Sequence, residues 1–170
     1  MDDALQLNWD QFDTQFPSRA EYDARAEGSG IDWSQYPDHE TVEDGEYQVA
    51  TLTITPPMKN NFPDPRAKNP KPIRYIYFVV VDADDPNDVG KVIRKKVTDS
   101  GHPLSSAYPF LEAAHGGRIP PEVAPRFSDL RDKQFKITLA EKYGNSGNAY
   151  QAWVLVRPVK PENYKQAPPF

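Results

Sequence analysis

The 170-residue sequence has room for one domain of ordinary size with appendages, and it contains no cysteine. It therefore cannot form a disulfide or a cysteine-bearing zinc site, and it has no thiol that could act as a nucleophile. The net charge of −5 is unevenly divided: residues 1–46 hold thirteen acidic and two basic side chains, whereas residues 47–170 hold twelve acidic and eighteen basic ones. This asymmetry predicts a polyanion-binding body preceded by an acidic segment that competes for the same surface.

The acidic segment contains one short motif twice. The pattern Trp-x-Gln-aromatic occurs over residues 9–12 and again over residues 33–36, on either side of a predicted short helix at residues 18–27. Two interpretations are open: the aromatic rings anchor the segment on the body, or they dock onto another protein. We expect residues 1–31 to form a partly helical or disordered acidic N-terminal extension.

Beyond Gly45 the sequence has the pattern of β-strands. Residues 46–55 are rich in β-formers that alternate between two faces, and a Pro-Pro pair ends the run. Residues 73–81 are apolar on both faces, which predicts a strand covered on both sides. The Asp-rich turn at residues 82–90 leads back into a strand over residues 91–98, so the two strands form a hairpin.

The second half of the chain predicts one helix and two more strands. Residues 103–115 have a helical pattern ended by a Gly-Gly pair, and Pro109 must lie in the first turn of that helix. Strands are predicted over residues 134–141 and 149–157. A Gly- and Asn-rich hairpin loop at residues 142–148 joins them.

Five strands with a helix between the third and the fourth follow the element order of the OB-fold. A β-sandwich or an open α+β sheet is compatible with the same order. We therefore expect a mainly β, five-stranded OB-type Greek-key barrel over residues 32–160, followed by a Pro-rich tail over residues 161–170.

Cationic and aromatic side chains gather on the parts of such a barrel that bind single strands, namely strands two and three and two of the loops. The cations neutralise phosphates, and the rings stack on bases at about 1–3 kcal/mol for each base. The predicted nucleic-acid contacts are Lys59, Phe62, Arg66, Lys68, Lys71, Arg74, Tyr75, Tyr77, Lys91, Arg94 and Lys96. For the two tyrosines, packing beneath the front segment is an equally good interpretation.

The sequence predicts no catalytic site, no metal and no cofactor. The Asp-rich turn lacks the glycine and the final glutamate of an EF-hand, and the three histidines are scattered. Walker, nucleophile-elbow and zincin motifs are absent. We therefore expect a protein that is not an enzyme.

Several short motifs accompany the predicted elements: Trp33 and Tyr36, Gly45-Glu46-Tyr47, Gly90-Lys91, Gly116-Gly117, and Asp129-Leu130-Arg131-Asp132-Lys133. In these motifs, residues 32–157 resemble small phage-encoded single-stranded-DNA-binding proteins with an OB-type core. The resemblance implies single-stranded-DNA binding in phage-like replication or recombination. Relatives of that kind usually carry an acidic C-terminal tail with a terminal aromatic residue. This chain ends in Phe170, but its acidity lies at the N-terminus.

The sequence thus predicts a single-stranded nucleic-acid-binding protein, with DNA as the expected ligand. Replication or recombination proteins are expected partners through Phe170 or the N-terminal segment, and a homo-oligomer is compatible with the sequence. No apolar run is long enough to span a membrane and no leader peptide is visible, so we expect a cytoplasmic protein, in the host cytoplasm if phage-encoded. The alternatives are a protein-binding adaptor or virion component that docks through its Trp-x-Gln-aromatic segments, a carbohydrate-binding β-sandwich, and an enzyme.

Overall fold

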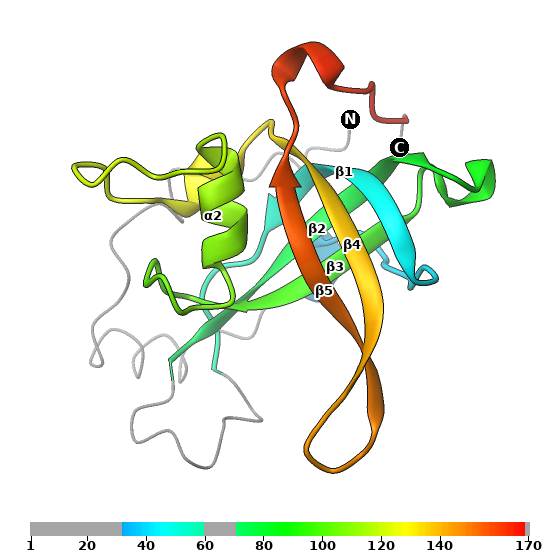
Figure 1. Ribbon diagram of the computed structural model, residues 1–170, viewed down its shortest axis with the longest axis horizontal. Coiled ribbons are helices and arrows are strands. Elements are labelled where there is room, and N and C mark those ends of the chain that lie inside the picture. Colours follow the sequence, from blue (N-terminus) through cyan, green and yellow to red (C-terminus); the bar gives the residue numbers. More distant parts are fainter. Residues whose placement is uncertain (1–31, 60–70, 169–170) are drawn as a thin grey trace.

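The computed structural model describes residues 32–59 and 71–168 and is mainly β (Figure 1). Its strands are β1 (Gly45–Ile54), β2 (Ile73–Ala83), β3 (Val92–Thr98), β4 (Gln134–Tyr143) and β5 (Ala149–Pro158), and the helix α2 (Tyr108–Ala114) lies between β3 and β4. Each predicted strand is confirmed to within two residues at either end. The predicted N-terminal extension, its helix at residues 18–27 and the first copy of the Trp motif lie outside the described residues.

The five strands form one antiparallel sheet in the order β3-β2-β1-β4-β5. Because β4 returns to lie beside β1, strands β4-β1-β2-β3 have the spatial order of a Greek key. The predicted closure of the barrel is wrong. In the part of the chain that the structure describes, β3 and β5 are the two edges of the sheet and no ladder joins them.

Residues 40–44 lie between the two sheet edges. The Glu40 backbone N–H donates to the Val92 carbonyl on β3 at 2.8 Å, and the Gln151 side chain on β5 donates to the Val42 carbonyl at 2.8 Å. The Val42 side chain is buried in the core. Elsewhere along β5, α2 packs against the strand. Residues 40–44 thus bond to both of the edges that a closed barrel would join by strand pairing.

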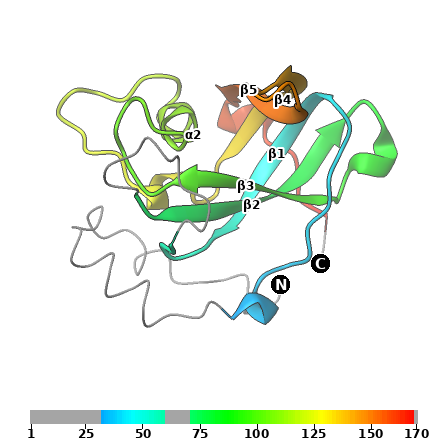
Figure 2. The ribbon, with the colours of Figure 1, turned by 90° about the horizontal axis from the view of Figure 1, so that it is seen from below.

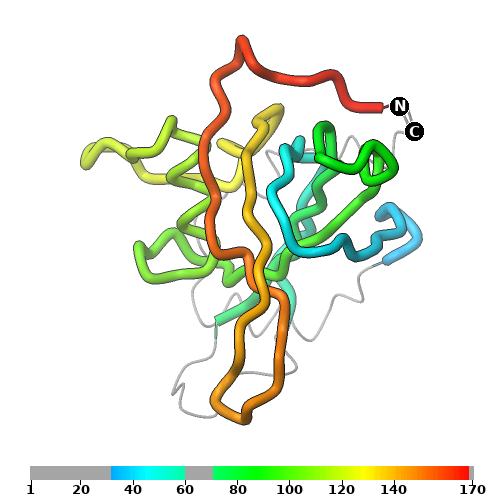
Figure 3. The backbone as a smooth tube through the Cα atoms, turned by 45° about the vertical axis from the view of Figure 1, so that its right-hand side comes forward, coloured from blue at the N-terminus to red at the C-terminus, as the bar shows by residue number. Residues whose placement is uncertain are grey.

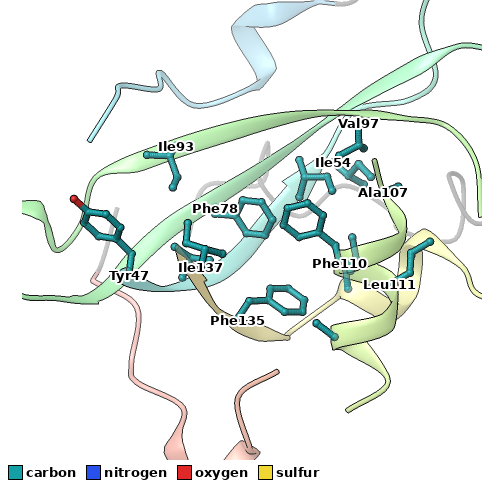
Figure 4. Close-up of a cluster of buried hydrophobic side chains, with 14 of the residues drawn as sticks. Tyr47, Ile54, Phe78, Ile93, Val97, Ala107, Phe110, Leu111, Phe135 and Ile137 are labelled. Atoms are coloured by element: carbon teal, nitrogen blue, oxygen red, sulfur yellow. The ribbon is translucent and has the colours of Figure 1, made fainter. Parts of the chain in front are cut away.

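The core consists of aromatic and aliphatic side chains between the inner face of the sheet and α2 (Figure 4). The Phe78 ring from β2 stacks on the Phe110 ring from α2 with centroids 5.5 Å apart, and Phe135 from β4 meets Phe110 edge-on at 6.2 Å. Trp153 on β5 contacts both Phe78 and Phe110. Four elements distant in sequence therefore share one aromatic cluster.

Two local predictions need correction. The helix begins at Tyr108 and not at residue 103, because Ser105 and Ser106 bond to backbone groups around β3 instead of continuing a helix. Pro109 does lie in the first turn, as expected. Strict alternation along β1 is also wrong: Val49 and Ile54 both face the core, because a register shift between Thr51 and Thr53 changes which residues point inward.

The C-terminal segment after β5 lies on the opposite face of the sheet from the core. The Gln134 side chain on β4 donates to the Lys165 carbonyl at 2.6 Å and accepts from the Lys165 backbone N–H at 3.0 Å. The segment passes the short 3-10 turn η6 (Pro161–Asn163) and reaches the β2–β3 turn, where Pro168 lies beside Gly90. Figure 3 shows this path above the sheet, with the β4–β5 hairpin projecting at the opposite end.

Candidate nucleic-acid interface

The candidate interface is the face of β2 and β3 turned away from the core, which we call the outer face. Alternation along β2 places Ile76 and Phe78 in the core and leaves Tyr75 and Tyr77 on the outer face. In the antiparallel register, Tyr75 lies opposite Lys96 and Tyr77 lies opposite Arg94. The strand pairing therefore places two rings and two cations in one patch, although the residues come from separate strands.

Arg94 is held against the rings of this patch. Its guanidinium carbon lies 4.1 Å from the ring centre of Tyr75 and 5.5 Å from that of Trp33, which are cation–π distances. Its Nη1 also donates to the Tyr77 hydroxyl at 3.4 Å. The side chain is half-buried, so these contacts fix the position of its charge on the outer face.

The second Trp-x-Gln-aromatic copy covers part of this patch. Trp33, in the 3-10 turn η3 (Trp33–Gln35), meets Tyr75 edge-on with centroids 5.8 Å apart. Tyr36 stacks on Tyr77 at 5.5 Å with 19° between the ring planes. Tyr77 is only 1% exposed, whereas Trp33 is 45% exposed. Packing beneath the front segment is therefore confirmed for Tyr77, and residues 33–36 are confirmed as an anchor. Figure 2 shows the turn η3 on the side of β2 and β3 away from α2.

Two groups in the covering segment have shifted pKa values. Burial raises the pKa of Tyr36 to about 12, with a further contribution from Tyr77 and an opposing one from Arg74. The pKa of His39, whose ring lies edge-on to Tyr77, is lowered by desolvation and by Arg94, while Asp38 opposes that shift. Both side chains are therefore uncharged at neutral pH.

Arg74 does not belong to the interface. It has the same parity along β2 as Ile76 and points to the core side, where it is 1% exposed. Its Nε lies 2.6 Å from Asp99 Oδ1, and its guanidinium lies over the Phe127 ring at 4.6 Å. Reaching a phosphate would mean leaving a buried carboxylate unpaired, so the predicted contact from Arg74 is corrected to a structural ion pair.

Lys91 lies at the other end of the β2–β3 hairpin, in an acidic environment. Its Nζ is 2.8 Å from Asp88 Oδ1, and this hydrogen bond raises the pKa of the lysine. It lines a cavity of about 410 Å³ together with the acidic side chains of Glu43, Asp44, Glu46, Asp84, Asp85 and Asp88. Its surroundings repel phosphate, so we remove Lys91 from the interface as well.

The remaining predicted cations lie near the loop between β1 and β2. Lys59 and Lys71 are exposed on either side of residues 60–70, where the Met58–Ile73 bridge brings the two chain segments together. Lys71 Nζ is 3.4 Å from Ser100 Oγ. The predicted contacts Phe62, Arg66 and Lys68 lie outside the described residues.

Sequence reasoning omitted Trp33 and Tyr36 from the site, although it had identified their motif. The motif itself was the available signal. A pair of aromatic residues that occurs twice, in a chain that also has a predicted strand bearing aromatic residues, indicates that the rings pack on one another.

The Asp-rich turn is confirmed as an exposed turn. The Asp85 side chain caps the 3-10 turn η4 (Pro86–Asp88) by accepting from the Asn87 backbone N–H at 2.9 Å. Within residues 32–59 and 71–168, no three acidic or histidine side chains are arranged to hold a metal. None of the helices described there has the length and apolar character needed to cross a membrane.

No family model matches this sequence, and no curated protein matches it either. The function must therefore be inferred from the chemistry of the outer face.

Proposed function

We propose that this protein binds single-stranded nucleic acid, DNA in the first place, on the outer face of β2 and β3. The observation that carries the proposal is the register of these strands, which sets Tyr75 opposite Lys96 and Tyr77 opposite Arg94. Rings that can stack on bases and cations that can neutralise phosphates are the two components of sequence-tolerant single-strand binding.

The proposal includes an OB-type assignment for the sheet. The order β3-β2-β1-β4-β5, with α2 between β3 and β4, is compatible with a Greek-key barrel left open between β3 and β5. In that fold class, oligonucleotides bind on strands two and three and on the loops one–two and four–five. The projecting β4–β5 hairpin adds two exposed rings, Tyr143 and Tyr150, which are 71% and 52% exposed.

The setting we propose is phage-like replication or recombination in a host cytoplasm, without catalysis, in keeping with the resemblance of the sequence motifs. The adaptor alternative has weaker support. Its docking motif at residues 33–36 is engaged with the protein's own sheet, since the Tyr36 ring is stacked on Tyr77.

Fluorescence anisotropy with an oligo-dT of about thirty nucleotides tests the proposal directly. If Lys59, Lys71, Arg94 and Lys96 each neutralise one phosphate, log affinity should fall against log salt with a slope of about −3. The absence of any binding at about 50 mM salt would overturn the proposal.

A charge-removing pair of variants locates the site. Lys96→Ala should weaken binding severalfold at about 100 mM salt and make the slope shallower by about 0.7. Arg118→Ala removes another exposed cation, from the loop after α2, and should change neither quantity. Equal effects of the two substitutions would assign the binding to general charge and not to the outer face.

A further inference from the structure

We infer that Trp33 and Tyr36 act as an internal competitor of the nucleic acid: Tyr36 stacks on Tyr77, Trp33 covers Tyr75 edge-on, and both are displaced when a strand binds. This inference rests on the proposed function and adds its regulation. It concerns residues 32–40, which carry three acidic side chains and no lysine or arginine.

The Tyr36 ring has the near-parallel orientation of a stacked base. Tyr36 lies nearly parallel to Tyr77, with 19° between planes and 5.5 Å between centroids. The Arg94 guanidinium makes cation–π contacts with both Trp33 of the covering segment and Tyr75 of β2. Tyr77 cannot accept a base while Tyr36 covers it, because only 1% of its surface is exposed.

The segment also resembles a nucleic-acid strand in its charge. Asp32 precedes the rings of Trp33 and Tyr36, and Asp38 and Glu40 follow them, along an otherwise neutral stretch. Desolvation is the main cause that lowers the pKa of His39, and Arg94 adds to it, so the field of this cation reaches the segment. The acidic side chains of this segment would compete with phosphates for the field of Arg94.

The attachment of the segment permits its release. Among the described residues, the hydrogen bonds of residues 33–39 are local, as in the Tyr36 N–H bond to the Trp33 carbonyl at 3.1 Å. The first backbone bond to the sheet comes from Glu40 to Val92, and Val42 is then buried in the core. Residues 32–39 are therefore held to the sheet by ring contacts and can leave it without breaking a strand ladder or the core.

The test compares binding of the oligo-dT by the full chain and by Tyr36→Ala at about 100 mM salt. Removing the competing ring should tighten binding about fivefold or more, since the strand no longer displaces a stacked partner. Gln35→Ala, in the same turn and exposed, is the matched control and should leave affinity unchanged. Unchanged or weaker binding by Tyr36→Ala would overturn the inference and make Tyr36 part of the binding surface or a neutral anchor.

A second measurement uses the unsubstituted chain. The protein is labelled with 5-fluorotryptophan, and the Trp33 ¹⁹F signal is assigned through Trp33→Phe. Addition of oligo-dT should move the chemical shift of that signal to the value it has in the urea-unfolded protein, because the ring leaves Tyr75. Saturable binding with an unmoved Trp33 signal would overturn the inference alone. Failure of both the full chain and Tyr36→Ala to bind would overturn the proposed function.

Discussion

Arg74 and Asp99 form an ion pair of 2.6 Å in which the two side chains are 1% and 0% exposed. The pair joins β2 to the residue that follows β3. It lies beside Phe127 of the 3-10 turn η5 (Phe127–Leu130), whose ring contacts the guanidinium. Buried opposite charges depend on one another, because either one alone would be left uncompensated away from water. Removing either partner alone should therefore destabilise this end of the sheet.

Asp99→Asn should lower the free energy of unfolding by about 3–5 kcal/mol, because the guanidinium stays buried and loses its counter-charge. Urea unfolding followed by circular dichroism measures the loss. Asp132→Asn is the control, because its contact with Arg131 is exposed and 3.8 Å long. Asparagine also accepts the φ of 59° at that position. The control should change stability by less than about 0.5 kcal/mol, and equal losses would contradict the prediction.

Tyr75→Leu should weaken oligo-dT binding by a factor of about 5–150, corresponding to the loss of one stacked base. Leucine keeps an apolar side chain in the strand, so the fold should persist. Tyr108→Leu, on α2 at the core side of the sheet, is the matched control and should leave affinity unchanged. Anisotropy titrations of both variants make the comparison. Undiminished binding by Tyr75→Leu would remove β2 from the proposed interface.

Gln134→Leu should release the C-terminal segment. The Gln134 side chain makes both hydrogen bonds to Lys165 and accepts from Gln48 Nε2 at 2.8 Å. Leucine would leave the Lys165 N–H and carbonyl without this partner, whereas Gln48 Nε2 keeps its bond to the Asn163 carbonyl at 3.0 Å. A buried polar group left unpaired costs about 1–3 kcal/mol. Faster hydrogen exchange over residues 160–168 and a lower urea midpoint are the expected results. Gln166→Leu makes the same replacement at an exposed position and should leave exchange unchanged.

Acidification should loosen the covering segment at residues 32–39. The docked segment holds the pKa of His39 below its ordinary value of 6.5, so the released segment binds the proton more readily. Docking is therefore strongest above that value and weakens as the pH falls through the lowered pKa. The Trp33 ¹⁹F signal followed from about pH 7.5 to pH 5 reports the change. His39→Gln should abolish this pH dependence, and a response that persists in that variant would exclude His39 as its cause.

Sequence patterns located the strands well, and they also contained one signal that was overlooked. Arg74 shares its parity with Ile76 and Phe78, so period-two alternation already places it on the core side of β2. The cationic character of the region had favoured a surface position. By contrast, no local pattern reports the register shift in β1 that brings both Val49 and Ile54 into the core.

The open edge between β3 and β5 lay equally beyond sequence reasoning. Its cover depends on Val42 and Gln151, which meet only after the sheet has formed. The order of the elements along the chain predicts which consecutive strands pair. Closure of the barrel depends instead on how β3 and β5 lie relative to each other in the folded protein.

By itself, the sequence determined which residues form strands, where Pro and Gly end them, and that rings and cations alternate on β2 and β3. These properties depend on side-chain periodicity and on backbone constraints within a few residues. Only the tertiary structure decided which rings reach the solvent. Tyr77 is covered by Tyr36, a residue from another segment, and such a contact exists only because folding brings the two rings to one face of the sheet.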